Sequence, residues 1–319
     1  MSFSDTYNPN APSAVTGQGS AVSNREDLTD VLSILAPEET PILSTLPKSR
    51  ASSTFVEWTV DSLDTPTTAG VAEGADVTAF TDKFSGRARL GNYVQKFRRD
   101  YMVSDLQEAV DSVGPAKIAQ AEAKAIREIK RDIEATICSN NEMAVENGAG
   151  TAYGFRGLGK WLQSTAQGTN PVPADFRTPS SSIDDQGGTD ITEAEFNDLI
   201  TSIYRKTGTT DSLTLVADTN LRRTISDFAR IGVSNENRQF NLNGESGSIK
   251  LSVELYQSDH GIVSVINGNP DCMPTTDPVN NTGYLLNPEY AGIHELIPLG
   301  STRLPNLGGG ERGYVDCSL

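Results

Sequence analysis

Apolar and polar residues alternate over two extended stretches in the first third of the chain. Val56, Trp58 and Val60 fall on one face of a strand at residues 54–60, and a second extended run is expected from about Arg87 to Val103. The segment between them is too long for a tight turn and too poor in apolar residues for a domain. The pattern predicts a long β-hairpin, which has little core of its own and should pack against another chain.

A helical period replaces the alternation after the hairpin. The helix is expected to run from Pro115, a first-turn position after Gly114, to Asn140, over about 26 residues and roughly 39 Å. Its apolar stripe consists of Ile118, Ile126, Ile129, Ile133 and Ile137. The charged positions expected away from that stripe are Lys124, Glu128, Arg131 and Glu134. The segment is therefore predicted to be a spine helix that is buried along one edge.

A compact α/β unit is predicted in the next part of the chain. Thr192 is a good N-cap with Glu195 as its capping-box partner, and Ile191 can contact Phe196 across the first turn. This helix is expected to end at Gly208. The elements expected after it are a strand at 212–217, a helix at 221–230 with Leu221, Ile225 and Phe228 inward, and strands at 249–256 and 261–266.

The two ends of the chain are expected to be extended segments. Residues 1–24 contain few large apolar groups and cannot form a core. Helical spacing over Leu28, Val31, Leu32 and Leu35 is followed by a second short apolar turn, TPILSTLP, so this part reads as an arm that lies on other structure. The tail from Tyr284 to Leu319 is expected to return to the sheet beside the spine helix.

Composition and charge narrow the class of protein. Of the 319 residues, 36% are apolar, which suits a globular protein with two modest cores. The formal net charge of -16 makes most of the surface a poor match for free DNA, RNA or an acidic membrane. No stretch approaches the roughly 18 apolar residues of a membrane span, and the first residues lack the pattern of a signal peptide. We therefore expect a protein that is made in a cytoplasm and has no membrane partner.

Residues 154–161 read GFRGLGKW and resemble a phosphate-binding loop, GxxxxGK[ST], up to Lys160. Trp161 stands where that loop needs a hydroxyl for Mg²⁺, and the preceding residues are polar and glycine-broken instead of a buried strand. The favoured interpretation is a turn that docks Leu158, Trp161 and Leu162 onto a core, with glycines where the backbone bends sharply. No nucleotide or other cofactor is expected.

Candidate metal-binding thiols and imidazoles are few. Cys138, Cys272 and Cys317 form no CxxC motif, so buried free thiols are expected. The sequence contains only two histidines, which excludes a histidine-rich metal centre. No metal site is expected.

One catalytic arrangement remains as an alternative. Asp259 and His260 resemble half of a nucleophilic triad, but no GxSxG motif supplies a serine, and a turn or strand-end histidine is the plainer interpretation. An α/β enzyme in which Asp218, Arg222 and His260 converge is kept as a second function class. No catalytic residue is expected under the favoured interpretation.

The order of parts is more informative than any single motif. An arm, a long hairpin, a spine helix, an inserted α/β domain and a returning strand together resemble the major capsid protein of tailed bacteriophages, an α+β protein with the Hong-Kong-97-type capsid fold. The segments that carry this resemblance are, in order, ETPILSTLP, the EW of FVEW, the EG of VAEG, GNYVQ, KRDIE, GLGKWL, DTNLRRTISDF, YQSDHGIVSVI and LLNPEYAGIHEL. They cover nearly the whole chain after about residue 24.

The resemblance implies a division of the chain. It places an N-terminal arm at 1–50, an extended loop at 51–103, a peripheral domain with the spine helix at 104–185 and 276–319, and an axial domain at 186–275. GLGKW becomes the turn after the spine helix. The structural positions expected to hold these parts are Trp58, Pro115, Ile126, Ile133 and Trp161.

The resemblance also implies a function and partners. The chain should self-assemble through hexamers and pentamers into an icosahedral head shell around packaged double-stranded DNA, which would touch the inner face without sequence specificity. Some relatives carry a helical scaffolding segment at the N-terminus, whereas this chain starts almost directly at the arm, so a separate scaffolding protein is implied, together with a portal. The protein would reside in the virion after assembly in the cytoplasm of a host bacterium. A tail-tube type of phage structural protein is a further alternative.

Charge along the loop suggests a contact between subunits. From residue 83 to residue 99 there is no acidic residue, and the basic residues are Lys83, Arg87, Arg89, Lys96, Arg98 and Arg99. Acidic residues crowd the arm at Glu26, Asp27 and Asp30 and recur in the segment 183–204. The hypothesis is that the basic segment docks on acidic surface of an adjacent subunit, with the arm as the favoured partner. A solvated hairpin face and contact with packaged DNA are the alternatives.

Overall fold

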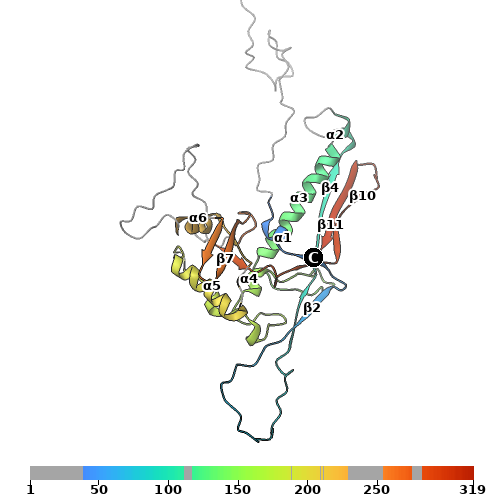
Figure 1. Ribbon diagram of the computed structural model, residues 1–319. Helices are drawn as coiled ribbons and strands as arrows, with labels where there is room; N and C mark the ends of the chain where they lie inside the picture. Colours follow the sequence, from blue (N-terminus) through green and yellow to red (C-terminus); the bar gives the residue numbers. More distant parts are fainter. Residues whose placement is uncertain are drawn as a thin grey trace, which may run out of the picture.

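The computed structural model describes residues 39–110, 117–187, 189–208, 210, 212–228, 254–274 and 282–319 (Figure 1). These residues form a mixed helix and strand structure with two separate hydrophobic cores. The apolar residues predicted for the arm, from Leu28 to Leu35, lie outside the described residues, as does Pro115. None of the helices in the described part of the chain is both long enough and apolar enough to cross a membrane.

The first core lies between the spine helix and a three-stranded antiparallel sheet. The helix α3 (Lys117–Cys138) packs along β4 (Lys96–Val103) and β11 (Glu311–Ser318), while β10 (Ile297–Leu304) forms the outer edge of the sheet. Alternate residues of β11, among them Val315 and Cys317, point into this core. The predicted return of the tail to the sheet beside the spine helix is confirmed.

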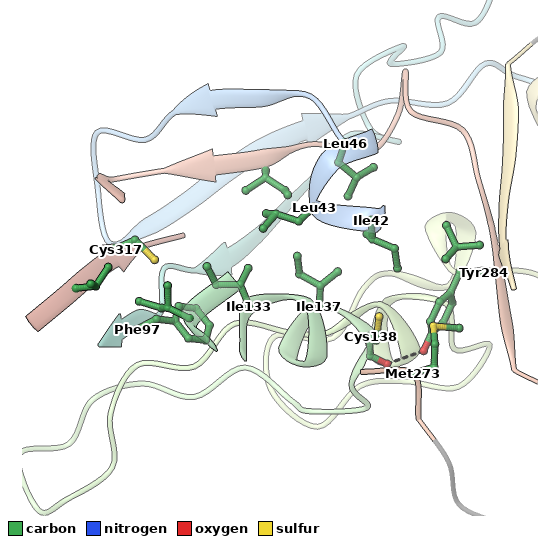
Figure 2. Packing of buried hydrophobic residues seen from close by; sticks show 14 of the residues in the cluster. Ile42, Leu43, Leu46, Phe97, Ile133, Ile137, Cys138, Met273, Tyr284 and Cys317 are labelled. Atoms are coloured by element: carbon green, nitrogen blue, oxygen red, sulfur yellow. Dashed lines mark hydrogen bonds between the residues drawn. The ribbon is translucent and has the colours of Figure 1, made fainter. Parts of the chain in front are cut away.

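The spine helix buries the predicted stripe, with one addition. Ile129, Ile133 and Ile137 are buried and Ile126 is half-buried against the same core. Glu134, which the pattern placed away from the stripe, is only 1% exposed, so that prediction was wrong. The short helix α1 (Pro41–Thr45) covers this part of α3 and removes Glu134 from water (Figure 2).

The hairpin is shorter than the sequence pattern suggested. Strand β2 (Phe55–Val60) pairs antiparallel with β3 (Ala88–Tyr93), with Trp58 opposite Leu90. The predicted single run from Arg87 to Val103 is divided at Val94 and Gln95. At this point the hydrogen-bond partner of the backbone changes. The Val94 N–H donates to Thr54 O, whereas the Gln95 N–H donates to Leu319 O. After this change β4 belongs to the sheet under the spine helix instead of the hairpin.

Two short strands join the hairpin to the body. Strand β1 (Lys48–Arg50) pairs in parallel with β9 (Ile293–Glu295). Helix α2 (Asp105–Ala109), capped by the Ser104 hydroxyl, follows β4. The one-turn helix α4 (Leu158–Trp161) and two 3-10 turns (Ala174–Phe176 and Ser180–Ser182) lead from the spine helix to the second core.

The second core is an α/β unit whose sheet has the order β6-β7-β5-β8. Its helices are α5 (Glu193–Thr207) and α6 (Thr219–Phe228). Its strands are β5 (Leu213–Ala217), β6 (Leu255–Ser258), β7 (Gly261–Asn267) and β8 (Gly283–Leu286). Strand β5 is buried along its whole length because its two faces pack into different cores, Val216 into the first core and Leu213, Leu215 and Ala217 into the second. The predicted strand at 249–256 falls partly outside the described residues.

Local predictions in this unit are confirmed. Both hydrogen bonds of the Thr192–Glu195 capping box are present, and Ile191 packs against the core that contains Phe196. The helix α5 ends at Gly208, whose φ of +73° is the left-handed conformation that glycine adopts at little cost. The inward residues of α6 are those expected, with Ile225 and Phe228 buried and Leu221 partly buried.

Strand β8 lies in a different sheet from the one expected for the tail. It pairs antiparallel with β5, so residues 283–286 complete the sheet of the α/β unit. Tyr284 nevertheless also reaches the first core, where its hydroxyl donates to the Cys138 carbonyl at 2.6 Å (Figure 2). This strand therefore connects the two cores directly.

Candidate assembly surfaces

The loop of the hairpin is the most exposed part of the described chain. Every residue from 61 to 87 is exposed, and the loop extends away from the body (Figure 1). Its apolar side chains include Leu63, 98% exposed, and Phe80, 91% exposed. Such a segment has no core within its own subunit, and contiguous exposed apolar groups are typical of an interaction site.

Most of the basic segment has partners within the chain. Five of its six basic side chains form ion pairs, namely Lys83 with Asp64, Arg87 with Asp61, Arg89 with Glu57, Lys96 with Asp316 and Arg99 with Asp132. The hydrogen bond from Arg87 holds the pKa of Asp61 below its ordinary value. Arg99 is held by both carboxylate oxygens of Asp132, at 2.6 and 2.7 Å, and this pairing raises the pKa of Arg99.

Arg98 differs from the other five. It is exposed on the face of β4 that points away from the spine helix, because the alternate residues Phe97 and Tyr101 are the buried ones. Among the described residues it forms no ion pair, since Lys96 already holds Asp316, the residue opposite Arg98 on β11. The arm residues Glu26, Asp27 and Asp30 lie outside the described residues, so docking between the basic segment and the arm stays a prediction.

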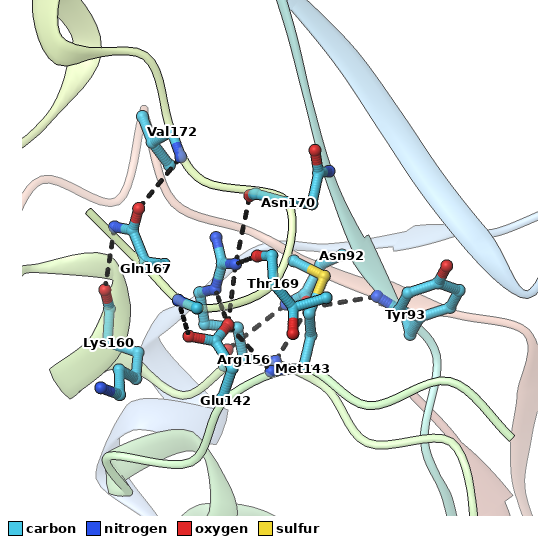
Figure 3. A network of polar contacts seen from close by, with 11 residues as sticks. Asn92, Tyr93, Glu142, Met143, Arg156, Lys160, Gln167, Thr169, Asn170 and Val172 are labelled. Carbon is cyan, nitrogen blue, oxygen red and sulfur yellow. Dashed lines mark hydrogen bonds and ion pairs between the residues drawn. The ribbon is translucent and has the colours of Figure 1, made fainter.

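The sequence reasoning missed a buried arginine inside GFRGLGKW. The Arg156 side chain is fully buried, its Nε donates to Glu142 Oε1 at 2.8 Å, and its Nη2 donates to the carbonyls of Thr169 and Asn170 (Figure 3). Burial would raise the pKa of Glu142, but hydrogen bonds from Arg156 and from two backbone N–H groups bring it below its ordinary value. The sequence did contain a signal for this ion pair, because an arginine in a turn that docks onto a core needs a partner once the turn is buried.

Arg156 also connects this turn to the base of the hairpin. Its backbone N–H donates to Asn92 Oδ1 at 2.8 Å, and Asn92 Nδ2 donates back to the Arg156 carbonyl at 3.3 Å (Figure 3). The guanidinium carbon lies 4.8 Å from the centre of the Trp161 ring. The Trp161 ring in turn lies 5.5 Å from the Trp58 ring of β2. The base of the loop is thus held by the two hydrogen bonds between Asn92 and Arg156 and by the contacts that lead from Arg156 through Trp161 to Trp58.

The glycines of this turn have a different reason from the one predicted. Gly157 has a φ of -73°, so no unusual conformation requires glycine there. A side chain at Gly157 would instead collide with the Ser139 carbonyl, and one at Gly159 with the Asn140 side chain. Close approach to the backbone after the spine helix, not a sharp bend, explains Gly157, whereas the Asn140 side chain could move away from a substituted Gly159. The turn does follow the spine helix, as expected.

Docking of the apolar residues of this turn is confirmed in part. Leu158 and Leu162 pack against the first core. Trp161 is only half-buried, and its main contacts are the Trp58 ring and Arg156, so the expectation of a buried indole was wrong. Trp58 itself is 40% exposed. The reason is that both indoles lie at the margin between the core and the hairpin.

The start of the body is fixed by a buried carboxylate. Glu134 Oε1 accepts the N–H of Ile42 and Oε2 that of Leu43, each at 2.9 Å, so the residue satisfies the first free donors of α1. Burial raises the pKa of Glu134, and the two backbone hydrogen bonds oppose that effect only partly. Cys138, buried one turn later on α3, was the sequence signal that this side of the helix is also covered.

The residues of the enzyme alternative do not converge. His260 lies in the turn between β6 and β7, against the Tyr204 ring, and its carbonyl accepts from Thr210 near the start of β5. Asp218 follows the last residue of β5, and Arg222 donates to the Val265 carbonyl at 2.6 Å. Because β5 and β7 are parallel neighbours, His260 and Asp218 lie at opposite ends of the pair. The interpretation of His260 as a turn residue is confirmed.

The thiols are buried and free, as expected. Burial raises the pKa of Cys272 and that of Cys317 to about 11 each, and that of Cys138 further. Within the part of the chain that the structure describes, no three His, Cys, Asp or Glu side chains gather in a way that could hold a metal ion.

Comparison with known proteins identifies the kind of chain to which this geometry belongs. The model of the SU10 major capsid protein family matches residues 14–318. No curated protein matches the chain. The fold is similar to that in a structure of the capsid of Cyanophage P-SCSP1u, with a TM-score of 0.58, 12% identity, and 98% of this chain and 94% of that chain covered.

Two further solved structures agree. The similarity to a structure from Mycobacterium phage Bobi has a TM-score of 0.54 and 10% identity, covering 94% of this chain and 89% of that one. The similarity to the capsid of an empty GTA particle has a TM-score of 0.53 and 12% identity, covering 97% and 94%. The predicted α+β capsid fold of the Hong-Kong-97 type is confirmed.

Proposed function

Since this chain belongs to the SU10 major capsid protein family and is a phage head shell protein, we propose that it closes that shell as hexamers and pentamers around double-stranded DNA. Rings of this kind repeat one heterologous contact between neighbouring subunits. Each subunit therefore needs two different surfaces, one that inserts into its neighbour on one side and one that binds the neighbour on the other side. The observation that supports the inserting surface is the loop at 61–87, because this loop is exposed along its whole length and carries apolar side chains.

The division of the chain follows the two cores. We assign residues 1–50 to the arm and 104–185 with most of 276–319 to the peripheral domain. The axial domain at 186–275 also takes β8, because that strand completes its sheet. The extended loop, placed at 51–103 from the sequence, has its hairpin part between Phe55 and Tyr93. The axial domain would line the ring centre.

The hairpin suits a shell in which subunits meet at slightly different angles. Its strands are held to the body at their base by Asn92 and by the ring of Trp58, while the loop beyond Val60 has no buried residue up to Arg87. A segment with so few buried contacts deforms at low cost, whereas repacking a core does not. The same loop could therefore serve pentamers and hexamers.

Further partners follow from the family. We propose that these partners are a separate scaffolding protein, a portal and packaged DNA on the inner face. We also propose that the protein assembles in the host cytoplasm and catalyses no reaction. The basic segment at 83–99 would dock on the arm of an adjacent subunit. Because five of its cations are paired within the described part of the chain, Arg98 is the one of the six that can make that contact without breaking an ion pair among the described residues.

The test of the proposed function is the assembly state of the purified protein. Sedimentation and negative-stain microscopy are expected to show closed shells or ring-shaped capsomers. Tubes would favour a tail-tube protein, and a small monomer that turns over a substrate would favour the enzyme alternative. Either result would overturn the proposal.

A further inference from the structure

Asparagine is followed directly by glycine at three places in the sequence. The pairs are Asn147–Gly148, Asn243–Gly244 and Asn267–Gly268, of which the second lies outside the described residues. Such a pair is prone to spontaneous loss of the asparagine amide, because glycine has no side chain that keeps its own nitrogen away from the asparagine side chain. The surrounding structure decides whether the reaction occurs at each pair.

This deamidation needs a free backbone N–H on the glycine. Solvent hydroxide removes the proton from that N–H, the nitrogen attacks Cγ of the asparagine, and ammonia leaves as a succinimide ring closes. Water then opens the ring at either of its carbonyl groups, which gives aspartate or isoaspartate. In total, water is consumed and ammonia is released, and no electrons are transferred. A buried glycine N–H that already donates a hydrogen bond must first give up that bond, at a cost in free energy.

The first pair lies in an exposed loop after the spine helix. The loop is closed by two backbone hydrogen bonds between Ala144 and Gly154, at 3.0 and 3.1 Å, and every residue from 145 to 152 is exposed. The Gly148 N–H makes no hydrogen bond among the described residues. The space beside the Gly148 Cα is open, since no atom beyond the chain neighbours lies within 4 Å of the place of a Cβ. Solvent therefore reaches both the nitrogen and the Asn147 amide.

The Asn147 side chain is held in a way that favours attack on its amide carbon. Its Oδ1 accepts the N–H of Ala149 at 2.9 Å and that of Thr151 at 3.3 Å. Attack on Cγ places negative charge on this oxygen, so the two N–H groups stabilise the tetrahedral intermediate as an oxyanion hole does. The loop thus places a free nucleophilic nitrogen next to a polarised amide.

The third pair is closed to the same reaction. Gly268 is buried, and its N–H donates to the Ala217 carbonyl at 2.7 Å, beside the point where Ala217 of β5 faces Asn267 of β7. A nitrogen bonded in this way at the end of a sheet becomes free only when the sheet opens, and such openings are far rarer than motions of an exposed loop. The Asn267 side chain is exposed, but its attacking group is not available.

We propose that Asn147 is a site of spontaneous deamidation in the folded subunit and that Asn267, which is also followed by glycine, is protected by the sheet. The product places a new carboxylate beside Glu146 and so makes the loop more acidic. Isoaspartate, the second product, also adds a carbon to the main chain of the loop. The inference concerns a chemical modification and does not depend on the proposed shell function.

Peptide mapping of aged protein tests the proposal. Folded subunits are kept at mildly alkaline pH, digested at low pH, where deamidation is slow, and analysed by mass spectrometry. Conversion at Asn147 is expected to exceed that at Asn267 by about tenfold or more, because the bonded N–H of Gly268 is rarely released. Equal conversion of the two residues in the folded protein overturns the inference.

The matched control is the same incubation in guanidinium chloride at the same pH. Without the sheet and the loop, the two pairs are expected to react at similar rates. Asn147 should react at least as fast in the folded protein as in the denatured chain, because the donors from Ala149 and Thr151 are lost on unfolding. An Asn147 that reacts more slowly in the folded protein overturns the inference.

Variants assign the reaction by its change in charge. The background is Asn243→Gln, which removes the pair outside the described residues. On isoelectric focusing, aged protein is expected to gain a more acidic band, which a further Asn147→Asp change shows from the start. A further Asn147→Gln change is expected to prevent the band, because glutamine must close a larger ring, whereas Asn267→Gln should leave it unchanged. A band that forms at the same rate with Asn147→Gln assigns the reaction to another residue and overturns the inference.

Discussion

The carboxylate of Glu134 accepts the backbone N–H of Ile42 at 2.9 Å, across 92 positions of sequence. With the second bond to Leu43, this contact fixes the point where the arm enters the body. Ile42 and Leu43 pack over Ile133 and Ile137 beside it, so an apolar contact and a buried charge hold the same short helix (Figure 2).

Removal of this carboxylate should destabilise the subunit. Glu134→Ala leaves two N–H groups of α1 without acceptors inside the core, and each buried unsatisfied donor costs about 1 to 3 kcal/mol. Glu134→Gln keeps one acceptor oxygen and should cost less. Chemical denaturation of the subunit measures both, with Glu128→Gln, a half-exposed position on the same helix, as the control. A Glu134→Ala variant as stable as Glu128→Gln would show that α1 does not depend on the carboxylate.

The same residue should make stability depend on pH. The pKa of Glu134 is raised in the folded state, so the folded protein holds this proton more tightly than the unfolded chain does. The stability that this group contributes is therefore fully present below its ordinary pKa of about 4.3 and is lost as pH rises through the raised value. Relative to Glu134→Gln, the wild type should lose unfolding free energy as the pH rises from about 4 through the raised pKa of Glu134. A constant difference across that range would contradict the raised pKa.

Two cations of the glycine-rich turn should behave very differently. Arg156→Ala leaves Glu142 partly buried without its partner, and breaking a buried pair typically costs about 3 to 5 kcal/mol, or somewhat less here because Glu142 keeps some exposure. Lys160→Ala removes a half-exposed side chain and should cost less than about 0.5 kcal/mol. Thermal unfolding compares them.

The Lys160→Ala variant also tests the resemblance to a phosphate loop. Its titration with ATP is expected to match that of the wild type. An affinity tighter than millimolar in the wild type that disappears in this variant would restore a nucleotide role.

The two indoles at the hairpin base should be coupled. Trp161 is half-buried, so Trp161→Ala should cost less than the roughly 3 to 5 kcal/mol of a fully buried Trp and should leave a soluble subunit. Trp58→Ala should have a smaller effect. A double-mutant cycle is expected to show about 0.5 to 1.5 kcal/mol of coupling between the rings. Strict additivity would mean that the rings merely lie near each other.

Sequence patterns predicted the elements whose cause is local. The capping box of Thr192 and Glu195, the glycine end of α5 and the isoleucine stripe of α3 depend on residues within a few positions of one another. The partner of β4 and the burial of Glu134 depend on segments about 200 and 90 positions away, which no periodicity reports. The division of the extended run at Val94 and Gln95 was missed for the same reason, since the residues on both sides of it are extended.

The candidate site shows the same division. The basic segment at 83–99 was visible in the sequence, but its partners were not, because Asp61, Asp132 and Asp316 come from the loop, the spine helix and the last strand. Only the structure separates Arg98 from the five paired cations.

The difference between Arg98 and the five paired cations makes the prediction about the basic segment more specific. Arg98→Glu breaks no ion pair among the described residues, so the isolated subunit should keep its thermal stability. The triple change Arg87→Glu, Arg89→Glu, Arg98→Glu also breaks the pairs with Asp61 and Glu57, but these pairs are exposed and contribute little to the stability of the subunit. Both variants should therefore fold, which circular dichroism and thermal unfolding verify before assembly is measured.

Assembly should respond to the same changes, and more so at low salt. Arg98→Glu should raise the concentration needed for assembly a few-fold and the triple variant more, because several weak pairs add at one interface. Since the Debye length is about 8 Å at physiological salt and about 3 Å at 1 M, the differences should shrink as salt rises. Sedimentation at both salt concentrations measures this, with Lys130→Glu as an exposed cation outside the segment for control. Reversal of the arm charges at Glu26, Asp27 and Asp30 should restore the triple variant if the arm is the partner. Normal shells from the triple variant at low and high salt alike would show that the basic segment does not dock electrostatically, and failure without rescue would place its partner on another acidic surface.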